Sequence, residues 1–180
     1  PLVKDILLDI LRHGLPDQQA EAARAAGELH LDAAVPLLFD LLRAFDSPAG
    51  HADQYAARRS EVMFALAELE AEEIVEEVLP LINHQDVFVR AAAANTLIAL
   101  EWEPEDDAGW AKLYAAASLW GDCVKVGTPA IPVLIALLRD PLLAIRALAA
   151  ETLAQIGDPS ALPALLQALH DLPEEDGHGE

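Results

Sequence analysis

The end of the chain repeats itself, and this repetition constrains the fold more than any other feature of the sequence. The segments IPVLIALL and LPALLQAL place Pro132 and Pro163 at matching positions, 31 residues apart. A period of this length is typical of a unit of two short helices with their turns. One such unit cannot bury its own apolar stripe, so neighbouring units stack and share a core. The sequence therefore predicts an all-α fold, a right-handed α-solenoid of stacked antiparallel helix pairs.

The unit can be followed towards the start of the chain. Arg59, Arg90 and Arg146 precede matching runs of small and aliphatic residues, and Pro36 matches Pro163 in a further copy. We expect about four to five repeats in one domain over residues 1–172, with one atypical, Trp-rich inserted unit. The predicted parts are an incomplete first repeat at 2–14, repeats at 16–45, 53–83, 85–138 and 140–172, and an acidic flexible tail at 173–180.

Local signals indicate where the helices begin and end. Thr128 and Asp140 each precede a proline, which is the pattern of an N-cap followed by proline at the first helical position. Gly14, Gly127 and Gly157 are expected to close helices in a left-handed conformation. No alternating pattern of useful length occurs, so we expect no sheet. Helical spacing assigns four residues to the core: Leu38, Val78, Leu134 and Leu165.

The repeat also carries a family resemblance. The segment AETLAQIGDPSALPALLQAL has the pattern A-x-x-L-x-x-I-G-D-x-x-A-x-P-x-L-x-x-L, and D-x-x-x-x-x-R opens a unit. This pattern resembles the short HEAT-like repeats first associated with phycobilisome lyases, and the resemblance covers the chain from Ala20 to Leu172. It implies stacked helix pairs. For function it implies several classes, because such repeats occur in bilin lyase subunits, assembly factors and signalling proteins.

Two interruptions break the period. The spacing from Arg90 to Arg146 is 56 residues instead of 31, and the insertion is placed at 102–120. The interrupting stretch holds four large aromatic residues: Trp102, Trp110, Tyr114 and Trp120. These aromatics either fill a widened gap between helix pairs or form an exposed ledge that anchors a partner or a planar ligand. The second interruption, Phe45 to Asp53, is expected to be a surface loop.

Charge excludes one class of partner. The chain has 11 basic and 31 acidic residues, which gives a net charge of -20. Such a field repels phosphate backbones, so we expect no nucleic-acid binding. The acid is concentrated in two clusters, which contain Glu68, Glu70, Glu72, Glu73, Glu76 and Glu77, and then Glu101, Glu103, Glu105, Asp106 and Asp107. Each cluster is either a solvated surface or a docking site for a basic partner.

The sequence offers little for catalysis or for membrane insertion. Cys123 is the only cysteine, and the six histidines show no metal-ligand spacing. No nucleotide-binding loop or nucleophile elbow occurs. No apolar run approaches the roughly 20 residues that span a bilayer. We therefore expect a cytoplasmic, non-catalytic protein with no catalytic residue, cofactor, metal or membrane contact.

The repeated arginines allow two interpretations. Arg59, Arg90 and Arg146 form either an anion-binding row or part of the framework of the stack. Asp86 before Arg90 and Asp140 before Arg146 favour ion pairs or caps between successive turns. We therefore assign these five residues to a structural ladder.

The leading functional prediction is a protein-protein interaction scaffold. Stacked second helices are expected to line a concave surface, and the candidate contact residues are Asp40, Arg43, Glu73, Glu77, Arg139 and Gln167. This surface is mainly acidic, so its partner is expected to carry a basic or mixed-charge patch. The resemblance implies an alternative, a bilin lyase or lyase-chaperone subunit that holds a tetrapyrrole against the aromatics. A second alternative is a regulatory repeat domain of a larger signalling protein.

Overall fold

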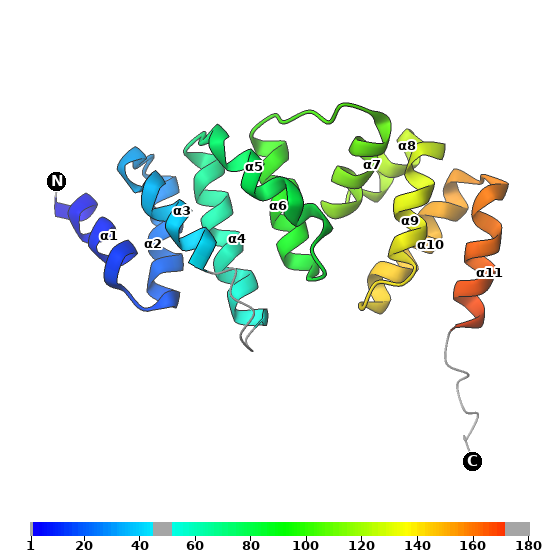
Figure 1. Ribbon diagram of the computed structural model, residues 1–180, viewed down its shortest axis with the longest axis horizontal. Helices are drawn as coiled ribbons and strands as arrows, with labels where there is room; N and C mark the ends of the chain where they lie inside the picture. The colour runs from blue at the N-terminus through cyan, green and yellow to red at the C-terminus, as the bar shows by residue number, and fades with distance from the viewer. Residues whose placement is uncertain (1, 45–51, 172–180) are drawn as a thin grey trace, which may run out of the picture. The chain divides into compact units, whose positions relative to one another are not determined.

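The computed structural model describes residues 2–44 and 52–171, and the side chains of the second range from residue 57 onwards. These residues form α-helices and short 3-10 helices with no strand among them, which confirms the predicted all-α fold (Figure 1). The chain divides into two compact units, Pro1–Glu103 and Pro104–Glu180. The predicted repeat 85–138 crosses this division. A single domain over 1–172 and a right-handed course of the solenoid stay predictions, and the tail 173–180 lies outside the described residues.

Unit 1 is a series of helices in which α4 and α6 each pack on the helices before them. Its α-helices are α1 (Leu2–His13), α2 (Pro16–Glu28), α3 (Val35–Ala44), α4 (Ala52–Glu68), α5 (Val75–Val78) and α6 (Val87–Ala99). Three 3-10 helices join them, η1 (Asp32–Ala34), η2 (Glu72–Ile74) and η3 (Leu79–Asn83). Helix α4 contacts both α2 and α3, and α6 contacts α4, α5 and η3. The core residues Leu38 and Val78 are fully buried, as the helical spacing predicted.

The helix after η2 changes form within one turn because of a proline. Helix α5 ends at Val78, and the chain continues as η3 from Leu79. Pro80 has no backbone N–H to donate, and its ring clashes with the carbonyl four residues earlier in an α-helix. The tighter 3-10 turn avoids that clash and keeps the segment packed against α6.

Unit 2 contains α7 (Asp107–Ala116), α8 (Trp120–Val126), α9 (Ile131–Leu137), α10 (Leu143–Ile156) and α11 (Leu162–His170), with η4 (Thr128–Ala130) and η5 (Pro159–Ala161). One apolar cluster joins these helices and includes Cys123, Leu134 and Leu153. Leu165, which was predicted to be a core residue, is only half-buried and packs against this cluster. The order α8–η4–α9 repeats as α10–η5–α11: η4 and η5 begin at Thr128 and Pro159, 31 residues apart, which is the unit seen in the sequence.

Residues with positive φ close six of the described helices, and four of these residues are not glycine. His30, Glu70, Glu101 and Ser118 have φ of 45°, 52°, 54° and 61°, whereas Gly127 and Gly157 have φ of 74° and 70°. Of the two glycines, only Gly157 has the full left-handed helical conformation, because ψ of Gly127 is -132°. At the end of α4, the Glu70 N–H donates to Ala67 O and the next N–H donates to Leu66 O. This is the Schellman arrangement, which satisfies carbonyls that the helix end would otherwise leave unpaired. The same pair of hydrogen bonds follows α2, α6 and α7.

Three expectations about helix ends were wrong. Gly14 has no positive φ, and it is small because a Cβ there would lie 2.6 Å from Ile10 O. Thr128 caps no helix, since its hydroxyl lies 3.3 Å from Asp158 Oδ2 instead. Asp140 accepts a 2.9 Å hydrogen bond from the Leu142 N–H, but α10 begins only at Leu143. The aspartate therefore shapes the turn before the helix.

Candidate partner-binding surface

In unit 1, three of the predicted contact residues lie together. Arg43 of α3 pairs with Glu77 of α5 through Nη2 and Oε1, and its Nη1 lies 3.9 Å from Asp40 Oδ1. The Arg43 guanidinium also lies 5.8 Å from the centre of the Phe39 ring. Glu73 is exposed in η2, the 3-10 turn that leads directly into α5. The second helices of two repeats thus share one charged surface, because the ion pair joins α3 to α5.

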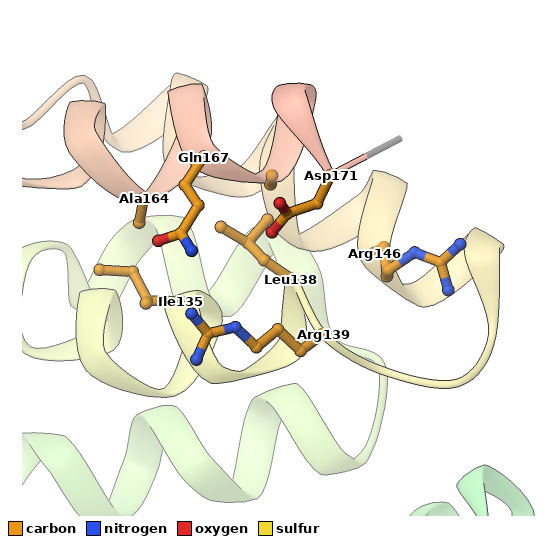
Figure 2. A pocket seen from close by; sticks show the side chains of 8 residues that line it. Ile135, Leu138, Arg139, Arg146, Ala164, Gln167 and Asp171 are labelled. Carbon is orange, nitrogen blue, oxygen red and sulfur yellow. The ribbon is translucent and has the colours of Figure 1, made fainter. Parts of the chain in front are cut away.

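In unit 2, the other two predicted contact residues line one cavity. Arg139 and Gln167 belong to a cavity of about 210 Å³ between the end of α9 and α11. Figure 2 shows the Gln167 carboxamide and the Arg139 guanidinium pointing toward one another, whereas the Arg146 guanidinium points away. The remaining lining residues are Ile135, Leu138, Ala164, Ala168 and Asp171. This cavity combines basic, acidic and amide side chains with an apolar floor, and the mainly acidic character expected of the second helices stays a prediction.

Asp171 was missed by the sequence interpretation, although the sequence contains the signal. It follows α11 and is the one carboxylate among the described residues that line the cavity. Its position is 31 residues after Asp140, the aspartate that was assigned to the ladder. Applying the repeat to the residue after each second helix would have found it.

Two of the repeated arginines make the same hydrogen bonds to their own backbone. Arg90 Nη1 donates to His84 O at 3.3 Å and Gln85 O at 3.0 Å. Arg146 Nη1 donates to Asp140 O at 2.8 Å and to the next carbonyl at 3.1 Å. Arg90 and Arg59 are buried. These donors therefore hold the turn before each first helix, which leaves less of each guanidinium for an external anion.

The two ladder aspartates act as acceptors for backbone N–H groups. Asp86 is the N-cap of α6 and accepts from Phe88 N at 2.8 Å and Val89 N at 3.2 Å. Asp140 accepts from Leu142 N in the matching turn of the later repeat. An N-cap of this kind stabilises a helix by about 1 kcal/mol. Both aspartates thus support the turns that the arginines also hold.

A further turn-to-turn contact joins the last two repeats of unit 2. Thr128 Oγ1 lies 3.3 Å from Asp158 Oδ2, and Asp158 Oδ1 accepts from Ser160 N at 2.8 Å. Hydrogen bonds from Ser160, and a smaller contribution from Thr128, lower the pKa of the Asp158 carboxyl. Equivalent turns of successive repeats therefore contact each other through polar side chains.

The aromatic residues of the insertion are all half-buried. Trp110 and Tyr114 of α7 have ring centroids 5.3 Å apart with a tilt of 31°. Tyr114 and Trp120 pack against the core of unit 2. This packing is what the gap-filling interpretation expects of these two residues. Trp102 belongs to unit 1, so the four residues do not come from one compact unit.

The geometry of the described residues offers little for catalysis. Cys123 is fully buried, and burial followed by the charge of Asp122 raises the pKa of its thiol to about 11. A thiol with that pKa carries almost no thiolate at neutral pH, which makes it a poor nucleophile. Within residues 2–44 and 52–171, no group of three His, Cys, Asp or Glu side chains is placed to hold a metal ion. No helix in the same ranges is long and apolar enough to cross a membrane.

Comparison with known proteins agrees with the helix pairs of unit 2. The family model described as HEAT repeats matches residues 100–176. No curated protein and no solved structure matches the chain. The matched stretch contains α8–α9 and α10–α11, the two pairs with the same turn between their helices. Over residues 100–176 the chain is therefore similar to HEAT repeats.

Proposed function

We propose that the chain is a non-catalytic protein-interaction scaffold, and that α3, η2 and α5 of unit 1 bind a partner with a basic or mixed-charge patch. The observation that carries this proposal is the Arg43–Glu77 ion pair, which joins second helices of successive repeats. The similarity to HEAT repeats supports it, because stacked helix pairs present extended surfaces that bind other proteins.

The charge of this surface points to the partner's chemistry. Glu72, Glu73 and Glu76 are exposed, and Arg43 is a cation among these carboxylates. A cation of the partner can take the place of Arg43 beside Glu77 or pair with the exposed glutamates. Surface charges of this kind act mainly on the association rate and on its salt dependence. Binding is therefore expected to weaken as salt concentration rises.

The test is a double charge reversal, Glu73→Lys with Glu77→Lys. The wild-type chain is used to capture proteins from a lysate, which mass spectrometry identifies, and the affinity of each purified candidate is then measured. We expect the variant to bind the partner at least about 10-fold more weakly, because the reversed charges repel the cations of the partner and slow association. Circular dichroism checks that the variant keeps its helices.

A matched control separates the local effect from net charge. Glu105 and Glu151 are exposed residues of unit 2, and reversing both changes the net charge by the same amount. This control is expected to keep nearly wild-type affinity. Equal loss in both variants would show that overall charge, not this surface, controls binding. Unchanged binding in the Glu73/Glu77 variant would overturn the assignment.

The tetrapyrrole role that the resemblance implies remains a separate candidate because of one observation. Trp110 and Tyr114 form a half-exposed ring pair that a planar ligand could extend. Titration of the protein with a bilin decides it, since binding shifts the absorbance of the pigment. If the absorbance does not shift, the tetrapyrrole role is ruled out, and the scaffold proposal is unaffected.

A further inference from the structure

The arginine of the unit 2 cavity corresponds to an arginine that is paired in unit 1. Arg43 lies eight residues after Val35, the first residue of α3, and Arg139 lies eight residues after Ile131, the first residue of α9. Arg43 contacts two carboxylates, one on its own helix and one on α5. Arg139 makes no hydrogen bond or ion pair with the residues that the structure describes. The same position thus carries a paired arginine in unit 1 and an unpaired one in the described part of unit 2.

Alanine replaces both carboxylates at the corresponding positions of unit 2. Asp40 corresponds to Ala136, since each lies five residues after the start of its helix. Glu77 corresponds to Ala164, because each is the third residue of the second helix in the next repeat, α5 or α11. Ala164 lines the cavity of about 210 Å³. The Glu77 carboxylate of unit 1 therefore corresponds to open space in unit 2, beside the unpaired arginine.

The other polar side chains of the cavity suit a bound carboxylate and a donor next to it. The Gln167 carboxamide and the Arg139 guanidinium point toward one another, so both can donate an N–H to a carboxylate that lies between them (Figure 2). Asp171 lies one turn after Gln167 on the same face of α11 and offers an acceptor. The Arg146 guanidinium points away and donates to backbone carbonyls of its own turn, so it takes no part in this contact. The polar groups therefore fit a ligand in which a carboxylate has an N–H donor close by.

The floor and the size of the cavity limit the bound group to about one residue. Ile135, Leu138 and Ala168 supply an aliphatic floor. Cavities that hold drug-sized molecules have volumes of about 300–1,000 Å³, so this smaller cavity suits one side chain with the groups beside it. The three polar side chains are exposed, so the rest of a peptide can leave the cavity towards solvent. An aliphatic residue has a carboxylate beside its backbone N–H only when it is the last residue of a peptide.

We propose that this cavity binds the C-terminal carboxylate of a partner protein whose last residue is aliphatic. The carboxylate accepts hydrogen bonds from Arg139 and Gln167, in the role that Glu77 has beside Arg43 in unit 1. The last side chain covers the aliphatic floor, and the last backbone N–H donates to Asp171. The site lies within unit 2, so it does not depend on the surface that is proposed in unit 1.

Titration of the whole chain with the peptide acetyl-glycyl-glycyl-leucine, followed by NMR, tests the site. The signals of the Gln167 side-chain amide are expected to shift and saturate, with a dissociation constant on the order of 1 mM for a group of this size. The same peptide with an amide in place of the terminal carboxylate is expected to bind at least about 10-fold more weakly, because charge-assisted hydrogen bonds are lost. Equal binding of the two peptides overturns the proposal, since the carboxylate is then not recognised.

Two further ligands separate the C-terminus from other carboxylates. Free leucine has the same carboxylate and side chain but no peptide bond, and acetyl-glycyl-glutamyl-glycine amide has only a side-chain carboxylate. Both are expected to bind more weakly than acetyl-glycyl-glycyl-leucine. Tighter binding of either one overturns the proposal, because the occupant is then a free amino acid or an internal acidic residue.

Three variants with the same change in net charge show whether the peptide binds in this cavity. Arg139→Gln removes the cation and is expected to weaken binding at least about 10-fold. Ala164→Glu places a carboxylate where unit 1 has one, so it is expected to pair with Arg139 and to abolish binding of the peptide. Lys112→Gln changes an exposed residue of unit 2 outside the cavity lining and is expected to keep wild-type affinity. Circular dichroism checks that each variant keeps its helices. Wild-type affinity in either cavity variant overturns the proposal, as does an equal loss in all three.

Discussion

Replacement of Glu70 by glycine should stabilise the protein, because Glu70 is a non-glycine residue in the left-handed region. Its φ is 52°, and its N–H completes the hydrogen bonds that close α4. For a residue with a Cβ, this conformation costs about 1–2 kcal/mol. Glycine removes that cost but loses about 0.5–1 kcal/mol more conformational entropy on folding. The net expectation for Glu70→Gly is a gain of about 0.5–1 kcal/mol.

Charge must be separated from backbone conformation, since Glu70 lies in an acidic cluster with Glu68, Glu72 and Glu73. Glu70→Ala removes the same charge but keeps a Cβ. The free-energy difference between the glycine and alanine variants therefore reports the backbone alone. Urea unfolding followed by helical circular dichroism measures both variants, and unchanged slopes allow the two free energies of unfolding to be compared.

The comparison of glycine with alanine can be repeated at two other helix ends, where φ predicts which variant has the larger free energy of unfolding. Ser118→Gly should be more stable than Ser118→Ala, because Ser118 has φ of 61°. Gly157→Ala should lose about 1 kcal/mol. The space around Gly157 would accept a Cβ, whose nearest atom would be Ala154 O at 3.9 Å, so this loss has a conformational cause. If glycine at position 70 is no more stable than alanine, the argument from φ is refuted.

Five other substitutions test polar groups that are buried or half-buried. Thr96 Oγ1 is buried without a hydrogen-bond partner among the described residues, whereas Thr152 Oγ1 donates to Leu148 O at 2.7 Å. Thr96→Val should therefore leave the free energy of unfolding unchanged or raise it. Thr152→Val should lower it by about 1 kcal/mol, as measured by urea unfolding. Because folding raises the pKa of the Cys123 thiol from 9.0 to about 11, the thiol's contribution to the free energy of unfolding is complete below pH 9 and is lost as pH rises through 11. The loss is about 3 kcal/mol, and Cys123→Ala should abolish this pH dependence. Arg90→Met should lower the free energy of unfolding by about 2 kcal/mol, and Arg146→Met should lower it by less, because Arg90 is buried and Arg146 is not. Equal decreases of both variants in thermal unfolding would contradict this prediction.

The fold could be predicted because burial follows the repeat period. Leu38, Val78 and Leu134 lie at helical spacing in matching units, and each is fully buried. The helix ends were harder to predict. The Schellman hydrogen bonds hold His30 and Glu101 at positive φ, a conformation that residue propensities alone would predict for glycine. Tertiary and local hydrogen bonds thus override the preference of the single residue.

The candidate surface could be predicted only in part, for a related reason. The period places Asp40, Arg43 and Glu77 on second helices, and the structure brings them into one ion-pair cluster. The period does not reveal that the surface of the later repeats differs in charge. Arg139 and Gln167 line a cavity of mixed character, because their neighbours come from a different pair of helices.

Three arginines of unit 1 are occupied within the chain. Arg90 donates to backbone carbonyls of the turn before its helix, and Arg59 is buried. Arg58 pairs with Asp17 between α4 and α2, at 2.8 Å. Glu77 is paired with Arg43, whereas Glu72, Glu73 and Glu76 are exposed on the same segment. If the proposed scaffold function is correct, these three carboxylates are the groups with which a cation of the partner would pair, so a basic or mixed-charge partner is proposed.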